Sequence, residues 1–234
     1  MPYAVITGAS QGIGKAITSH LLSKGFSVAI CARNYQKLRA AEAIWKEQYP
    51  LAQIITYSAD LGTANGVAEF AKEVLSVFPA IDILVNNAGT YEPGKVTDEP
   101  DGQLERMIQV NLYSAYRLTR ALLPIMQQKG SGHIFNMCSV ASLKAYANGG
   151  SYSISKYALL GFTDNLREEL REEGIKVTAI LPGATWSPSW EGSGVSPERI
   201  MEAEDIADML WATYSLSPRA VTETIIMRPV KGDL

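Results

Sequence analysis

The sequence predicts an α/β fold, in which a seven-stranded parallel sheet carries helices on both faces. Two observations predict it. Short apolar segments typical of strands alternate with segments of helical period along all 234 residues. Most of the strand-like segments are continuous apolar runs, which indicates burial on both faces of a sheet. No linker, repeat or low-complexity segment interrupts the pattern, so we expect a single domain over residues 1–234.

The first half of the chain alternates regularly between the two kinds of segment. Residues 3–7 and 26–33 are short and rich in β-branched and small residues, as strands are. The apolar residues of 13–25 and 35–49 recur with helical period, and Pro50 ends the second of these helices. The rest of this half is expected to form strands at 52–61 and 81–89 with a helix at 65–78 between them.

The second half continues the alternation with two longer helices. One helix is expected at 102–128, followed by a strand at 132–140. The other is expected at 151–174, where Gly174 stands at the position of a C-terminal stop. The last elements expected are a strand at 175–183, a helix at 202–215 and a strand at 223–230.

Composition excludes several function classes. Apolar residues make up 47% and charged residues 19%, as in a water-soluble domain, and the net charge of −3 gives no reason to expect nucleic acid or a membrane as partner. No apolar run is long enough to span a bilayer, and the N-terminus shows no cleavage signal, so we expect a cytoplasmic protein. Cys31 and Cys138 lack metal-ligand spacing, so we expect buried thiols and no metal site.

A glycine-rich turn, TGASQGIG (7–14), joins the first strand to the first helix. Gly8, Gly12 and Gly14 would let the backbone turn tightly and approach a pyrophosphate, which the free N–H groups of the helix would then bind. The spacing G-x-x-x-G-x-G differs from the usual dinucleotide fingerprint, but the strand–turn–helix context favours the same function.

The ends of the second and third strands indicate which dinucleotide binds. The second strand ends in ICARN, without an acidic residue for the ribose hydroxyls, and Arg33 suits a 2′-phosphate unless it is simply a solvated surface residue. We therefore favour NADP(H) over NAD(H). Asp60 ends the third strand and is expected either to accept from the adenine amino group or to cap the next helix. Asn87, Ala88 and Gly89 follow the fourth strand, where open parallel sheets bind ligands.

The pattern Tyr-x-x-x-Lys occurs twice, and helix geometry chooses between the two copies. Tyr91–Lys95 encloses Pro93 and Gly94, which break helices, so we discard it. Tyr152–Lys156 lies at the start of the 151–174 helix, where residues four apart share one face. A nearby ammonium would lower the pKa of the Tyr152 phenol and make it a general acid or base. The alternative is a tyrosine at the end of an amphipathic helix and a solvated lysine.

Three further polar features favour the catalytic interpretation. Ser139 stands where the fifth strand runs out, and its hydroxyl can donate to a substrate oxygen. Asn111 interrupts an apolar helical face, which we interpret as an anchor for a water chain to Lys156. Pro182–Gly183 ends the next strand and can turn the chain over a nicotinamide ring.

Together these residues resemble the short-chain dehydrogenase/reductase family, in order and spacing along the whole chain. The resemblance implies a Rossmann-like domain, a nicotinamide dinucleotide cofactor and an Asn–Ser–Tyr–Lys tetrad at Asn111, Ser139, Tyr152 and Lys156. In such a tetrad Tyr152 delivers a proton to a carbonyl oxygen that Ser139 holds, while hydride passes from nicotinamide to the carbonyl carbon. Lys156 binds the nicotinamide ribose and lowers the pKa of Tyr152, and Asn111 holds the water that reloads the proton.

The cofactor-binding positions expected are Gly8, Ser10, Gln11, Gly12, Ile13, Gly14, Arg33, Asn34, Asp60, Leu61, Asn87, Ala88, Gly89, Tyr152, Lys156, Pro182, Gly183, Thr185 and Ser187. Two departures from the family pattern matter. Gln11 stands where NADP-preferring members often carry a basic residue, so Arg33 carries the argument for the 2′-phosphate almost alone. Ser187 stands where a threonine is more usual, and Thr185 and Ser187 are expected at the nicotinamide amide and the phosphates.

The sequence therefore predicts an NADP-dependent oxidoreductase that interconverts a carbonyl and a secondary alcohol on a small substrate. The alternatives are an NAD-linked alcohol dehydrogenase and, from another class, a catalytically idle nucleotide-binding regulator. The resemblance implies a homotetramer or homodimer that packs the helices 102–128 and 151–174 against their symmetry mates. Residues 184–203, rich in Ser, Gly and Pro, are expected to form a substrate loop, in which Trp186 and Trp190 either pack the loop down or cover a pocket.

Overall fold

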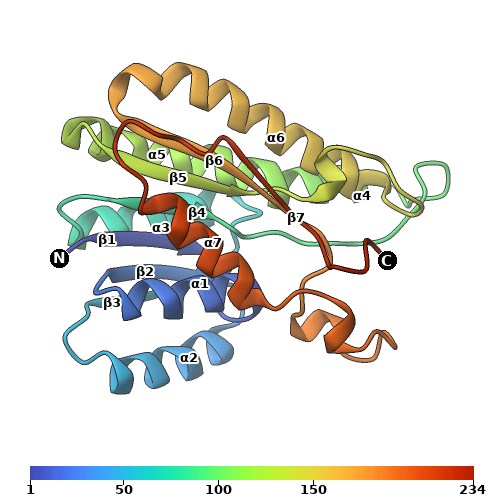
Figure 1. Ribbon diagram of the computed structural model, residues 1–234, viewed down its shortest axis with the longest axis horizontal. Coiled ribbons are helices and arrows are strands. Elements are labelled where there is room, and N and C mark those ends of the chain that lie inside the picture. Colours follow the sequence, from blue (N-terminus) through green and yellow to red (C-terminus); the bar gives the residue numbers. More distant parts are fainter.

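The computed structural model describes all of residues 1–234. Its centre is one parallel sheet in the order β3-β2-β1-β4-β5-β6-β7 (Figure 1). The strands are β1 (Tyr3–Thr7), β2 (Ser27–Ala32), β3 (Ile54–Ser58), β4 (Ile83–Asn86), β5 (Gly132–Met137), β6 (Ile175–Pro182) and β7 (Thr224–Met227). All seven predicted strands are confirmed, although all except β1 are shorter than predicted.

Helices cover both faces of the sheet, as the apolar strands require. They are α1 (Gly12–Ser23), α2 (Tyr35–Gln48), α3 (Ala64–Val77), α4 (Gln103–Ile108), α5 (Ser114–Lys129), α6 (Gly150–Leu170) and α7 (Ala203–Tyr214). Buried side chains of α1, α2 and α7 pack on one face in a cluster of 26 residues, and those of α3, α5 and α6 pack on the other in a cluster of 20. The predicted fold class is thereby confirmed.

Two of the predicted helices differ in detail from the prediction. The 102–128 helix is not continuous: α4 and α5 are separated by a π-helical turn at Gln109–Tyr113. A π turn inserts one residue per turn and is frequent at functional sites, and Asn111 lies in its middle. The 151–174 helix ends earlier, at Leu170, and continues as a 3-10 turn to Gly174, which adopts the left-handed conformation with φ 71°.

The sheet's strand order reverses between β1 and β4. The chain runs outward from β1 through β2 to β3, and then returns to the centre at β4 before it runs outward the other way. The connections diverge at such a point and leave a crevice beyond the carboxyl ends of the two central strands, where ligands of these sheets bind. The crevice lies between the turn after β1 and the turn after β4. No helix is both long enough and apolar enough to cross a bilayer.

Candidate active site

The glycine turn between β1 and α1 is built so that side chains are excluded from it. Gly8 and Gly12 have positive φ values of 67° and 55°, which glycine adopts at least cost. A Cβ on Gly14 would overlap the Gly8 carbonyl oxygen, and one on Gly8 would lie 3.0 Å from the Ala88 Cα. Each of the three glycines is therefore required by the local backbone, and the N-terminus of α1 stays accessible for an anion.

Asn87 and Ala88 hold this turn against the end of β4. The Asn87 Nδ2 donates to the carbonyl oxygens of Thr7 at 2.9 Å and Gly8 at 3.2 Å. The backbone N–H groups of Asn87 and Ala88 both donate to the Thr7 hydroxyl, at 3.0 and 2.8 Å. The Asn87 side chain therefore shapes the cradle for a ligand through the backbone of the glycine turn.

Positive charge gathers where β2 ends. Arg33 is exposed and makes no side-chain hydrogen bond or ion pair, so its guanidinium is free for a ligand. Asn34 caps α2 by accepting from the Lys37 N–H at 2.9 Å. The Lys37 ammonium donates to Gln11 Oε1 at 2.8 Å and is thus held over the glycine turn. Sequence reasoning missed Lys37. Its place in the first turn of the helix that Asn34 caps could have indicated that it lies near the glycine turn.

The predicted adenine contact at Asp60 lies at the carboxyl end of β3. Its side chain is not the cap of α3, which was the alternative role: Thr63 caps that helix by accepting from the Gly66 N–H at 3.0 Å. Asp60 Oδ1 accepts from the Gly62 N–H at 3.0 Å, and the residue is exposed. Leu61 beside it is buried in the core.

Tyr152 and Lys156 lie one turn apart on α6 and face the ends of β4 and β5. The Lys156 ammonium lies 5.8 Å from the centroid of the Tyr152 ring and donates to the Met137 carbonyl at 2.8 Å. The Lys156 side chain is 5% exposed, which excludes the alternative of a solvated lysine. Ser139, two residues after the end of β5, is buried; its hydroxyl accepts from the Ala141 N–H at 3.1 Å and interacts with the phenol of Tyr152.

Burial sets the protonation of both groups. Burial raises the pKa of the Tyr152 phenol, and the hydrogen bond with Ser139 offsets this only in part. Burial lowers the pKa of Lys156 to about 8. The lowering of the Tyr152 pKa by Lys156 that the resemblance implies is not seen in this structure, where burial and the neighbouring Cys138 thiol raise the pKa of the phenol. A phenol in this state keeps its proton at neutral pH, as a proton donor must.

Asn111 joins three parts of the site. Its Nδ2 donates to the Thr90 carbonyl at 3.0 Å and to the Ser155 hydroxyl at 2.9 Å, and its Oδ1 accepts from the Thr90 N–H at 2.8 Å. A Cβ on Gly89 would lie 3.2 Å from Asn111 Oδ1 and 3.5 Å from Lys156 Nζ, so both side chains converge on Gly89. A larger side chain at position 89 would fill the space between Asn111 and Lys156.

The 184–203 loop folds back on itself beside the glycine turn. Thr185 and Met201 form a short parallel bridge, and the Thr185 hydroxyl donates to the Gly183 carbonyl at 3.0 Å. A Cβ on Gly12 would lie 3.0 Å from the Ser187 Cβ, so this loop touches the turn that is expected to hold the phosphates. Pro182 is the last residue of β6 and pairs with Met227 of β7.

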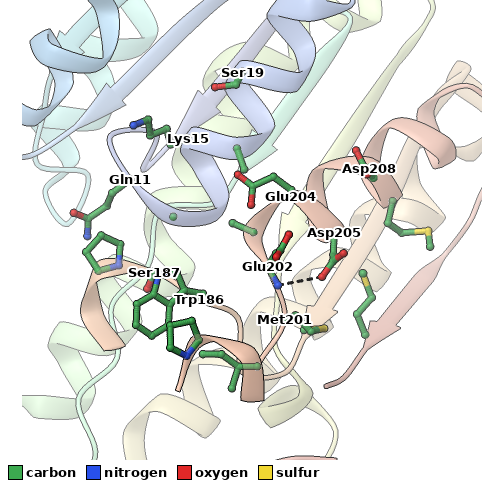
Figure 2. A pocket seen from close by; sticks show the side chains of 18 of the residues that line it. Gln11, Lys15, Ser19, Trp186, Ser187, Met201, Glu202, Glu204, Asp205 and Asp208 are labelled. Carbon is green, nitrogen blue, oxygen red and sulfur yellow. Dashed lines mark hydrogen bonds between the residues drawn. The ribbon is translucent and has the colours of Figure 1, made fainter. Parts of the chain in front are cut away.

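A groove of about 1760 Å³ lies between this loop and helices α1, α2 and α7. Figure 2 shows Trp186 and Ser187 facing α1 and the acidic residues at the start of α7. The groove reaches the glycine turn at Gly12, but Ser139, Tyr152 and Lys156 do not line it. Trp186 therefore lines a groove beside α1 and α7.

Two further tyrosines, Tyr91 and Tyr146, lie beside Tyr152. The Tyr91 ring meets the Tyr152 ring edge-on at 5.0 Å between centroids. Tyr146 lies close to both phenols, and burial together with these neighbours raises its pKa. Tyr91 belongs to the discarded Tyr91–Lys95 pattern, so the pattern was correctly rejected as a catalytic pair while its tyrosine still reaches the site. Cys31 and Cys138 are buried free thiols, as predicted.

The described residues fit a nicotinamide dinucleotide. The cradle at Gly8, Gly12 and Gly14 has no room for side chains, the free Arg33 guanidinium stands at the end of β2, and the buried Lys156 faces the opening at Gly89. Groups of acidic, cysteine or histidine side chains that could hold a metal ion do not occur.

Comparisons with known proteins agree with this geometry. Residues 2–194 match the family described as short chain dehydrogenase. An uncharacterized oxidoreductase of Staphylococcus epidermidis is 34% identical over 227 residues, 97% of this chain and 96% of the relative. The sepiapterin reductase of Chlorobaculum tepidum is 30% identical over 98% of this chain and 97% of its own.

A solved structure with the same fold holds a bound cofactor. The alcohol dehydrogenase of the archaeon Thermococcus sibiricus, complexed with 5-hydroxy-NADP, superposes with a TM-score of 0.91 and 26% identity over 100% of this chain and 99% of the other. The chain belongs to the short-chain dehydrogenase/reductase family and is a nicotinamide dinucleotide-dependent oxidoreductase that acts on CH–OH and C=O groups.

Proposed function

We propose that the chain is an NADP-dependent reductase that interconverts a carbonyl and a secondary alcohol on a small substrate. The observation that carries the proposal is the half-buried Tyr152, which keeps its proton and lies beside the Ser139 hydroxyl. Both stand at the carboxyl edge of the sheet, next to the glycine turn. This arrangement supports reduction, because a carbonyl oxygen that receives negative charge needs a donor and an acid at the same point.

Each residue has a role in this reaction. When bound, the reduced cofactor supplies the hydride that forms the new C–H bond at the carbonyl carbon. Ser139 donates a hydrogen bond to the substrate oxygen, and Tyr152 gives that oxygen its phenolic proton, so the product is an alcohol. The Lys156 ammonium favours the phenolate that remains on Tyr152. Asn111 donates a hydrogen bond to Ser155, which lies on α6 between Tyr152 and Lys156. The tyrosines at 91 and 146 stand beside Tyr152 and are proposed to contact the substrate.

The cations at the end of β2 support NADP as the preferred cofactor. Arg33 is free, Lys37 is held by Gln11, and no acidic side chain stands at the end of β2 to bind a 2′-hydroxyl. Lys37 makes up for the absence of a basic residue at position 11. The Thermococcus sibiricus relative was solved with 5-hydroxy-NADP, which is consistent with this preference.

A turnover assay tests the proposed activity. We expect consumption of NADPH, followed by absorbance, only when a small ketone or aldehyde from a broad panel is present. Wild-type protein that binds NADPH and consumes it with none of these carbonyls would instead support the idle regulator.

A binding assay tests the cofactor preference. Quenching of tryptophan fluorescence should show that NADPH binds more tightly than NADH, and Arg33→Ala and Lys37→Ala should each weaken NADPH about tenfold while NADH changes little. Arg219→Ala, in the exposed segment between α7 and β7, is the matched control and should change neither. Equal affinity for both cofactors in the wild type would contradict the preference and favour an NAD-linked alcohol dehydrogenase.

A further inference from the structure

The start of α6, which carries Tyr152, has no cap of its own. Gly149 stands at the N-cap position and makes no side-chain hydrogen bond to the helix. The first N–H groups of a helix have no partner within the helix and need an acceptor from outside. The helix that positions the phenol therefore depends on another segment at its first turn.

Glu99 supplies this acceptor from 52 residues away in the sequence. One carboxylate oxygen accepts from the Ser151 N–H at 2.8 Å, and the other accepts from the Ser151 hydroxyl. Ser151 is 1% exposed and directly precedes Tyr152. A carboxylate at this end of a helix also interacts favourably with the helix dipole.

Two glycines make the space for this carboxylate. A Cβ on Gly150 would overlap Glu99 Oε1, and a Cβ on Gly94 would lie 2.6 Å from Glu99 Cγ. The Gly94 N–H also donates to the Asn148 carbonyl at 3.0 Å, which joins the β4–α4 segment, residues 87–102, to the turn before α6. The carboxylate thus sits in a fitted position and is not a chance surface contact.

A second contact holds the same helix one turn further on. Asn111 donates to the Ser155 hydroxyl, and Ser155 in turn donates to the Tyr152 carbonyl at 2.7 Å. Tyr152 lies between this contact and the Glu99–Ser151 contact. Tyr91, which meets the Tyr152 ring edge-on, belongs to the same β4–α4 segment as Glu99.

We infer that Glu99 is a positioning residue for the reaction: it caps α6 through Ser151 and so fixes the Tyr152 phenol against Ser139. The inference rests on the proposed function, because it takes Tyr152 as the proton donor. Misplacement of a reacting group by about 1 Å can lower the rate about 100-fold, so loss of this cap should slow the proton-transfer step.

Glu99→Ala and Glu99→Gln test the inference, with Asp98→Ala as the matched control. Asp98 is the preceding residue, exposed, and its side chain makes no ion pair or hydrogen bond. Glu99→Ala should lower kcat at least about tenfold while the Kd for NADPH stays within about twofold. Glu99→Gln keeps one acceptor for the Ser151 N–H, so it should fold normally and fall in between. Asp98→Ala should match the wild type.

Two readouts separate positioning from a general loss of stability. The solvent deuterium isotope effect on kcat should rise in both Glu99 variants, because proton transfer becomes more limiting. A double-mutant cycle should show that Ser151→Ala lowers kcat little when it is added to the Glu99→Ala variant. An unchanged isotope effect, or additive losses, would overturn the inference.

Hydrogen exchange tests the cap without any turnover. Amides of residues 150–156 should exchange about tenfold faster in Glu99→Ala than in Asp98→Ala. Equal exchange would overturn the inference whatever the enzyme's activity. If exchange rises but the wild type reduces no carbonyl, the cap stands and only the proposed function fails.

Discussion

The chemistry of the site depends on how two side chains are buried. Tyr152 is half-buried and Lys156 is buried, and loss of solvent favours the neutral form of each: it raises the pKa of the phenol and lowers that of the ammonium to about 8. The Ser139 hydroxyl acts in the other direction and prepares the phenol for proton loss. The Tyr152 phenol therefore keeps its proton at neutral pH and can release it when negative charge develops on a substrate oxygen.

This protonation predicts how the reaction depends on pH. For carbonyl reduction, kcat/KM should be nearly constant between about pH 6 and 7, because both Tyr152 and Lys156 carry their protons there. It should fall above about pH 8, as the Lys156 ammonium is lost and no longer favours the phenolate. Initial rates of NADPH consumption across this range give the profile. A value of kcat/KM that rises from pH 7 to 9 would contradict the assignment of a protonated phenol as the acid.

Residues that act through a tertiary contact could not be recognised in the sequence. Glu99 is one acidic residue among the 24 acidic residues of the chain, and only the folded structure brings it to Ser151. Lys37 reaches Gln11 because Asn34 starts α2 at a fixed position. The Tyr152–Lys156 pair and the glycines could be predicted because their spacing is set locally, by one helix face or one turn, whereas Asn111 and Ser139 were joined to them through the family resemblance.

At the scale of elements, two irregular segments build the site. The π turn at Gln109–Tyr113 places Asn111 where it reaches both Thr90 and Ser155. The sequence predicted a continuous helix there, because a π turn keeps helical composition and has no local signal of its own. The glycine turn could be predicted, because a single tight turn leaves no room for side chains at these three positions.

The glycine turn gives a prediction with an internal control. Gly14→Ala should destabilise the protein by about 1–3 kcal/mol, because the new Cβ meets backbone that cannot move away, and NADPH binding should be lost. Gly161→Ala, at an exposed site of α6 where a Cβ meets no atom within 4 Å, should stabilise the protein by about 0.5–1 kcal/mol. Urea unfolding and fluorescence quenching measure both. A Gly14→Ala variant that still binds NADPH would contradict the close approach of a ligand to this turn.

At the scale of the whole molecule, the reversal of strand order places the site. Turns after β1 and β4 meet at the centre of the sheet. Helix α6 packs on the sheet with α5 (Figure 1), and its Lys156 reaches the carboxyl end of β5. The alternation of apolar strands and helices predicted this architecture, because a sheet that is apolar on both faces must be covered by helices on both. The sequence did not determine the substrate pocket, since its walls come from loops that pack only in the fold.

The outer surface of α5 and α6 predicts association with a second copy of the chain. Leu104, Tyr116, Ile154 and Tyr157 are each between 38% and 45% exposed on α4, α5 and α6. We propose that these helices form the interface of a homodimer or homotetramer. Sedimentation should give two or four times the chain mass of 25.4 kDa, and Tyr116→Glu with Tyr157→Glu should yield monomers. A wild-type monomer at micromolar concentration would contradict the proposal.

The central claim, that the Tyr152 phenol is the proton donor at a bound cofactor, is tested most directly by Tyr152→Phe. The substitution removes one oxygen and keeps the ring that packs against Tyr91. With a carbonyl that the wild type reduces, we expect NADPH consumption to fall at least about 100-fold while NADPH still quenches tryptophan fluorescence with a similar Kd. Turnover by the Phe variant at the wild-type rate would contradict the claim.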